Sequence, residues 1–195
     1  MTVRMPTLTG NRITVREFRA GDLEEVHRVL YRAWQTPEQE LTSARTRHER
    51  RLHWTIESYD QLSQLDQPPY GDRAICTRDG RLVGVVGLVP CLGPFRRLPG
   101  FPDEDLGVGW STEVGLYWAV DPEHQGQGYA TQAGHLVMQF AFEDLHLERV
   151  IATTRFDNAG SIGVMRKLRM SILRNPTNEP LWLQIVGVRG RENRS

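Results

Sequence analysis

The stretch that decides the fold is Asp121-Pro122-Glu123-His124-Gln125-Gly126-Gln127-Gly128-Tyr129-Ala130. An alternating strand pattern over Thr112–Val120 precedes the glycines, and a helical pattern over Tyr129–Leu145 follows them. Backbone N–H groups at a helix N-terminus, together with the helix dipole, form a site for phosphate. Because glycine carries no Cβ, Gly126 and Gly128 would let a ligand approach the backbone closely. The pattern predicts a strand, a phosphate-binding loop and a helix, although such glycines also occur in plain turns.

Hydrophobic periodicity extends this unit in both directions. Upstream it predicts a strand over Leu8–Phe18, helices over Leu23–Trp34 and Thr42–Leu65, and a hairpin of Arg73–Arg78 with Leu82–Leu92. Downstream it predicts a strand at Val150–Thr154, a helix at Ser161–Leu168, and closing strands at Met170–Leu173 and Leu181–Val188. The expected fold is a single mixed α/β (α+β) domain. Residues 93–110, rich in Gly and Pro, are expected to be a surface excursion or a substrate-facing flap.

The charge and hydropathy of the chain argue against two classes of partner, nucleic acids and membranes. The chain has 195 residues, and Lys+Arg and Asp+Glu both total 24, so its formal net charge is zero. A neutral chain has no general attraction for nucleic acid or anionic membranes. No apolar run approaches the ~20 residues of a membrane span, and the first residues lack a secretory apolar stretch, so we expect a cytoplasmic protein with no membrane partner.

The cysteine and histidine pattern predicts no metal site. Cys76 and Cys91 do not have the spacing of metal ligands. A two-residue turn at Asp79-Gly80 would set Cys76 opposite Val83, which leaves Cys91 beyond disulfide reach. His48 and His53 fall in the charged second helix and are expected to face solvent.

Four blocks of sequence, in order, resemble the GNAT superfamily of acyl-CoA-dependent N-acetyltransferases, and its RimJ/RimL-like branch in particular. The blocks are Leu8–Phe18 followed by Asp22, Thr112–Trp118, Gln125-x-x-Gly128-x-Ala130, and Asp157–Leu168. The likeness covers a core of about residues 8–188, and the inserted loop at 93–110 is its least family-like part. It implies one acyltransferase domain over residues 1–195, with a central, mixed, mostly antiparallel twisted sheet that is splayed at the cofactor site and flanked by helices.

The resemblance also implies a binding site for acetyl-CoA. The amides of Gln125, Gly126, Gln127, Gly128, Tyr129 and Ala130 would bind its pyrophosphate. The strand end at Ala119 and Val120 would hydrogen-bond the pantetheine arm and supply a backbone N–H to the oxyanion. Asn158 would cap the downstream helix and contact the same arm.

The acid and base for direct amine attack are assigned with alternatives. Glu113 is the candidate base, acting through a water, and an exposed carboxylate in a salt bridge is the alternative. Met165 stands where the superfamily often has an acidic tyrosine, so Ser161 and Tyr117 become the candidate acids; plain helix capping is the alternative for Ser161. Arg169-Met170 also departs from the usual Gly-Phe.

The expected function is acetyl transfer to a primary amine, either a protein N-terminal α-amine or a small molecule. A catalytically silent acyl-CoA-binding module is the alternative, and a homodimer is left open. The acidic run Asp103-Glu104-Asp105 would either attract a cationic acceptor or simply keep its loop hydrated.

Overall fold

A computed structural model describes residues 4–102, 110–177 and 179–191. Its upstream elements are β1 (Leu8–Thr9), β2 (Ile13–Arg16), α1 (Leu23–Ala33), α2 (Leu41–Gln64), β3 (Gly71–Thr77) and β4 (Leu82–Gly93). Its downstream elements are β5 (Ser111–Val120), α3 (Tyr129–Glu143), β6 (Arg149–Thr154), α4 (Ala159–Lys167), β7 (Ser171–Arg174) and β8 (Ile185–Gly190). Strand order is β1-β2-β3-β4-β5-β6-β8-β7, with β5 and β6 parallel and five other pairs antiparallel. The mixed, mostly antiparallel α/β fold is confirmed.

The chain divides into two compact units, each of which is described by itself. The first comprises residues 1–88 and 118–140, and the second comprises residues 89–117 and 141–195. Because β4, β5 and α3 each contribute residues to both units, the units are not successive segments of the chain. The single-domain expectation stays a prediction.

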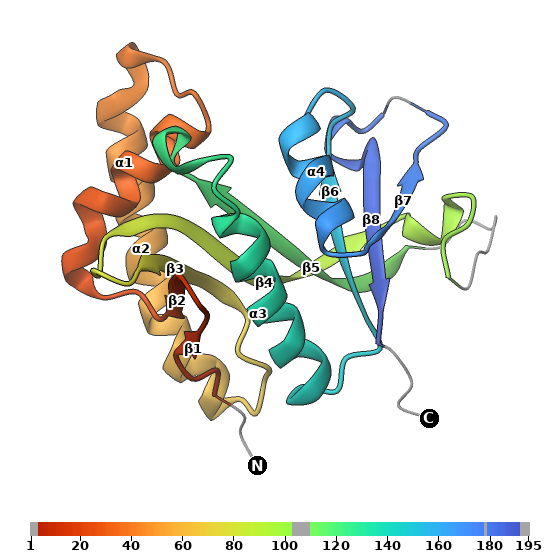
Figure 1. Ribbon diagram of the computed structural model, residues 1–195, viewed down its shortest axis with the longest axis horizontal. Coiled ribbons are helices and arrows are strands. Elements are labelled where there is room, and N and C mark those ends of the chain that lie inside the picture. The colour runs from red at the N-terminus through yellow and green to blue at the C-terminus, as the bar shows by residue number, and fades with distance from the viewer. Residues whose placement is uncertain (1–3, 103–109, 178, 192–195) are drawn as a thin grey trace. The chain divides into compact units, whose positions relative to one another are not determined.

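In the first unit, β3 and β4 are covered on both faces. Consecutive residues such as Ala74 and Ile75, or Val85 and Val86, are almost fully buried, as in strands with packed elements on either side. Figure 1 shows α2 behind these strands and α3 in front of them. A bulge after Ile75 sets Cys76 opposite Leu82 rather than Val83, which corrects the predicted register by one residue.

The prediction of one continuous strand over Leu8–Phe18 is wrong, because this segment forms two strands. Gly10 donates its N–H to the carbonyl of Ile13, and this turn divides the segment into the paired strands β1 and β2. Asp22 stands at the N-cap position of α1, but its carboxylate does not cap that helix. Instead it accepts two hydrogen bonds from Arg16, at 2.8 and 3.0 Å, and one from the backbone N–H of Arg19.

His48 corrects the expectation of a solvent-facing helix residue. It is buried between α1 and α2, where its Nδ1 lies 2.9 Å from Nδ1 of His27 and its ring packs edge-on against Trp34. Burial, reinforced by the charge of His27, lowers the pKa of His48 to about 4. His53, by contrast, is exposed as expected.

The second unit is built around β6 and β8. Ile151 packs with residues of β8 and with three residues of the loop after β4, namely Phe95, Leu98 and Phe101. The described half of the 93–110 segment is therefore partly core, with a 3-10 turn at Phe95–Arg97, and is not a surface excursion throughout. Asp103-Glu104-Asp105 lies outside the described residues.

Two further expectations concern the last predicted strand and the two cysteines. The predicted strand Leu181–Val188 begins late, because Leu181–Leu183 forms a 3-10 turn and β8 starts at Ile185. Both cysteines are free thiols, as predicted, although Cys91 is only half-buried. Among the described residues, no helix is both long enough and apolar enough to cross a bilayer.

Candidate functional site

The glycine loop between β5 and α3 has the backbone conformation that its sequence indicates. Gly126 and Gly128 have φ angles of +73° and +83°, in the left-handed region that glycine adopts without a steric penalty. A Cβ built on either residue would meet no atom within 4 Å. The loop therefore presents open backbone to solvent, which is the property needed for a close approach by a phosphate group.

The start of α3 provides the donors for such a ligand. Its first backbone hydrogen bond runs from the N–H of Gln132 to the carbonyl of Gly128. The N–H groups of Tyr129, Ala130 and Thr131 precede this bond and so have no acceptor within the helix. Together with the helix dipole, they make the loop a site for a negatively charged group.

Ion pairs, two of them to the buried carboxylate of Asp121, hold the beginning of this loop. Asp121 is fully buried, and its carboxylate accepts hydrogen bonds from the Glu123 N–H at 3.1 Å and from Arg28. Arg32, one turn further along α1, lies 3.5 Å from the Asp121 carboxylate and 2.7 Å from that of Glu123. The hydrogen bond from Arg32 lowers the pKa of Glu123. Sequence reasoning missed both arginines, because nothing in α1 signals a partner some 90 residues away.

The other side of the loop is braced by Arg12, from the turn between β1 and β2. Its Nη1 donates to the Gln127 carbonyl at 2.8 Å, and its guanidinium lies 4.8 Å from the ring centroid of Tyr129. Its backbone N–H donates to Oε1 of Gln132 at 3.1 Å. Three contacts from one residue thus tie the N-terminal turn to the loop and to α3.

Gln125 and the end of β5 are also joined. The Gln125 Nε2 donates to the Val120 carbonyl at 3.0 Å, so this carbonyl already has a partner within the protein. The Cβ position of Gly84 lies only 2.7 Å from the Ala119 carbonyl oxygen, so β4 approaches this strand end closely. The contact of Ala119 and Val120 with a pantetheine arm stays a prediction.

Glu113 lies in the second unit and is buried, not exposed. Its two carboxylate oxygens accept hydrogen bonds from Nε and Nη2 of Arg149, at 2.7 and 3.1 Å. The guanidinium of Arg149 lies 5.4 Å from the ring centroid of Phe101. The alternative to a catalytic role for Glu113 is a salt bridge, and Glu113 does form one with Arg149. The catalytic role stays a prediction.

Asn158, Ser161 and Tyr117 belong to the second unit as well. Asn158 is the N-cap of α4, because its Oδ1 accepts the backbone N–H of Ser161 at 3.0 Å. The predicted cap is confirmed, and it leaves the half-buried Ser161 hydroxyl without a capping role. Tyr117 is half-buried on β5. The catalytic roles of Ser161 and Tyr117 stay predictions.

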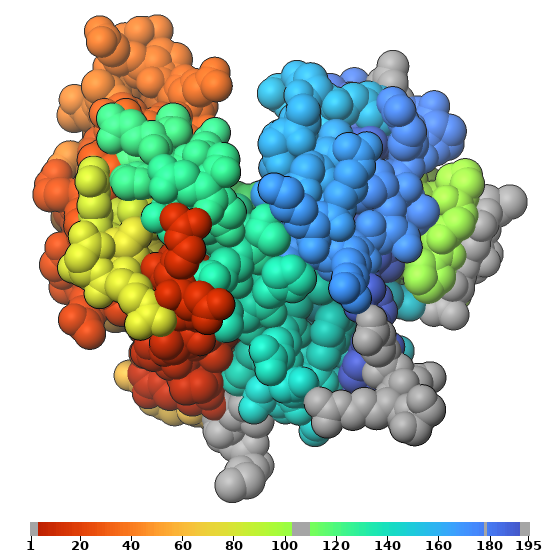
Figure 2. Space-filling model, in the orientation of Figure 1, coloured from red at the N-terminus to blue at the C-terminus, as the bar shows by residue number. Residues whose placement is uncertain are grey.

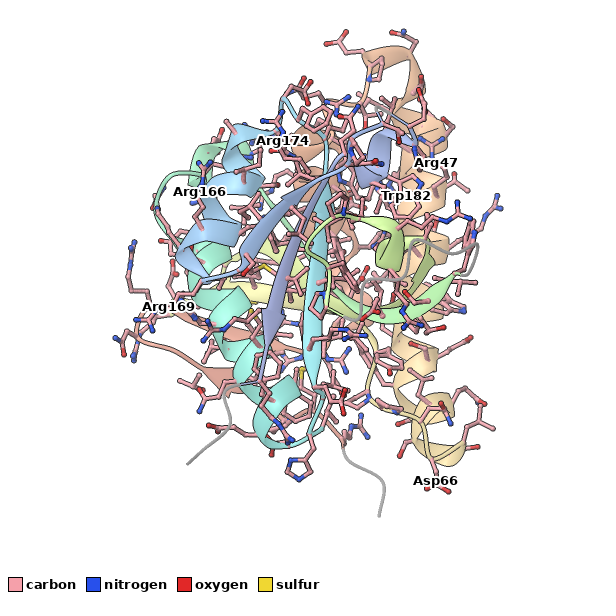
Figure 3. All side chains as sticks on the ribbon, turned by 90° about the vertical axis from the view of Figure 1, so that its right-hand side faces the viewer. Arg47, Asp66, Arg166, Arg169, Arg174 and Trp182 are labelled. Carbon is pink, nitrogen blue, oxygen red and sulfur yellow. The ribbon has the colours of Figure 1, made fainter. Side chains whose placement is uncertain are left out.

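The end of α4 explains one departure from the family pattern. Arg169 has φ +57°, and its N–H and that of Met170 donate to the carbonyls of Arg166 and Met165. This is the Schellman arrangement, in which glycine is the usual residue at the position of Arg169. Figure 3 shows Arg169 just past α4 with its side chain directed away from the strands. The arginine keeps the glycine-type turn despite its Cβ.

Comparison with known proteins places the chain. The sequence profile described as "Acetyltransferase (GNAT) domain" matches residues 12–171, so the chain belongs to the GNAT acetyltransferase family. A curated relative, the uncharacterized N-acetyltransferase YnaD of Bacillus subtilis, is 36% identical over 58 residues, a match that spans 30% of this chain and 33% of the relative.

Solved structures agree on the fold. The ribosomal-protein-S5-alanine acetyltransferase of Vibrio fischeri superposes with a TM-score of 0.68 at 14% identity, covering 97% of this chain and 98% of the other. RimL, a ribosomal L7/L12 α-N-protein acetyltransferase in complex with coenzyme A, superposes with a TM-score of 0.65 at 14% identity, covering 95% of this chain and 98% of the other.

In the part of the chain that the structure describes, no three His, Cys, Asp or Glu side chains gather as metal ligands.

Proposed function

We propose that this protein transfers an acetyl group from acetyl-CoA to a primary amine, by direct attack in a ternary complex. The observation that carries the proposal is the open loop of Gly126 and Gly128 in front of the α3 amides. Such a cradle fits a pyrophosphate, because two positive-φ glycines leave the backbone uncovered. Membership of the GNAT family and the coenzyme A complex of RimL support acetyl-CoA as the ligand.

The chemistry assigns each residue a task. The thioester supplies an activated acyl group, and an unprotonated amine attacks its carbonyl carbon. The developing oxyanion would accept a hydrogen bond from the backbone N–H of Ala119 or Val120. The departing thiolate would take a proton from Ser161 or Tyr117. Glu113 would remove the proton of the amine through a water. Since Arg149 holds both oxygens of Glu113, such a water must reach a carboxylate that the ion pair has already oriented.

For the acceptor we propose an α-amine at a protein N-terminus, with a small-molecule amine as the broader class. The support is the likeness of the fold to enzymes named for acetylating ribosomal proteins. The proposal that Asp103-Glu104-Asp105 attracts this amine concerns residues outside those that the structure describes.

The test is the release of free CoA thiol from acetyl-CoA in the presence of N-terminal peptides and small amines, with mass spectrometry of the products. We expect amine-dependent thiol release and a product heavier by one acetyl group. Tight binding of acetyl-CoA without turnover of any amine would favour the silent acyl-CoA-binding module. Met165 and Arg169, which depart from the family pattern, are the residues that support this alternative. Absence of binding would refute both functions.

A further inference from the structure

A hollow of about 500 Å³ lies beside the glycine loop, within the first unit. Three segments line it: the turn between β1 and β2, the turn between β3 and β4, and the loop before α3. Figure 2 shows these segments, coloured red, yellow and green, meeting on one face of the molecule. Gln127 and Tyr129 belong both to the hollow and to the loop, so a ligand on the loop would border the hollow directly.

Three arginines line the hollow, and one of them, Arg81, interacts electrostatically with the carboxylates of Asp79 and Glu123 without forming an ion pair. Arg12, Arg78 and Arg81 all line it, and none of them forms an ion pair with a described residue. Arg78 is held by the carbonyls of Asn11 and Gly10, at 2.7 and 3.3 Å, and Arg12 is held by the Gln127 carbonyl. Hydrogen bonds to carbonyls fix a guanidinium in place without neutralising its charge.

Two acids also line the hollow, and one of them, Glu123, has an ion-pair partner outside it. Glu123 is paired with Arg32 at 2.7 Å, which offsets its charge. Asp79 has a lowered pKa, first through a hydrogen bond from the Thr77 hydroxyl, so it remains an anion near Arg81. In addition, the Nε2 of His124 is buried at the edge of the hollow and has no hydrogen-bond partner among the described residues. Because Arg32 offsets Glu123, the three arginines outweigh the one remaining anion, Asp79, and the lining is net positive with one unused polar atom.

We propose that this hollow binds the 3′-phosphate of acetyl-CoA, an inference that rests on the proposed function. A phosphate monoester carries a charge of about −1.5 to −2 at neutral pH and pairs with guanidinium groups in charge-assisted hydrogen bonds. A ligand whose pyrophosphate lies on the loop amides carries this group only one ribose away, and the hollow adjoins the loop at Gln127 and Tyr129. The hollow therefore makes the protein discriminate acetyl-CoA from its 3′-dephospho form.

The test compares the affinities of acetyl-CoA and 3′-dephospho-acetyl-CoA by calorimetry, at low and at physiological salt. Wild type is expected to prefer acetyl-CoA, and Arg81→Gln to reduce that preference by about three- to tenfold, more at low salt. Arg12→Gln is expected to weaken both ligands, because Arg12 also braces the loop. Arg50→Gln, which removes an exposed arginine of α2 away from the hollow, is the control and is expected to change neither affinity.

The outcomes separate this inference from the proposed function. Equal affinities for the two ligands in a wild-type protein that turns over acetyl-CoA would overturn the inference and leave the function standing. An equal loss for both ligands in Arg81→Gln would also overturn it, since Arg81 would then act on the loop. Failure of wild type to bind either ligand would refute the proposed function itself.

Discussion

Replacement of Gly128 by alanine separates the two roles of this glycine. Its φ of +83° is strained for any residue with a Cβ, which costs about 1 kcal/mol of folding stability. The new methyl group meets no protein atom within 4 Å, so packing adds nothing to that cost. Instead it occupies the open side from which a phosphate would approach. We therefore expect Gly128→Ala to weaken acetyl-CoA binding at least tenfold, about 1.4 kcal/mol.

The assay is calorimetric titration of the folded variant with acetyl-CoA, accompanied by thermal unfolding. A loss of about 1 kcal/mol should lower Tm by roughly 2–4 °C in a chain of this length. Gly100→Ala is the matched control, because Gly100 has φ +79° and its added methyl makes only an ordinary contact with Leu173. It should lose comparable stability and keep full affinity. Unchanged affinity in folded Gly128→Ala would show that the loop does not bind the ligand.

Three further predictions concern stability and catalysis. Arg169→Gly should raise the free energy of unfolding by about 0.5–1 kcal/mol in urea titrations, because φ +57° costs glycine nothing; a loss of stability would contradict the Schellman assignment. His48, whose pKa is lowered to about 4 in the fold against an ordinary 6.5, stays neutral while the unfolded chain takes up a proton. Stability should therefore fall by on the order of 2 kcal/mol as the pH drops from about 6.5 to about 4, and His48→Gln should lose most of that slope. Glu113→Gln should keep acetyl-CoA affinity but lower kcat by about 10²–10⁴-fold, mostly at low pH, where the amine is protonated. Full activity across the pH range would remove Glu113 from the mechanism, and a loss of stability alone would assign it a structural role with Arg149.

The secondary structure around the glycine loop could be predicted from local sequence patterns. The alternation over Thr112–Val120, the glycines at 126 and 128 and the start of α3 at Tyr129 are all visible in the sequence, because backbone conformation there depends on neighbouring residues. The N-cap at Asn158 followed from the same local chemistry. The register at Cys76 did not, because a bulge leaves no signature in the hairpin residues.

Long-range partners were beyond sequence reasoning. Arg28 and Arg32 reach Asp121 across some 90 residues, and Arg149 reaches Glu113 across 36. Nothing in the sequence distinguishes these arginines from exposed ones, because their partners come close only in the folded chain. His48 was wrongly expected to face solvent for the same reason, since the charges around it gave no sign that α1 covers it. Burial of a polar residue depends on the element packed against it.

The most direct test of the account is a crystal structure of the protein soaked or co-crystallised with acetyl-CoA. The account predicts pyrophosphate oxygens within hydrogen-bond distance of the backbone N–H groups between Gln125 and Thr131, with Gly126 and Gly128 retaining positive φ. Acetyl-CoA bound elsewhere on the chain, with these amides facing only water, would contradict it.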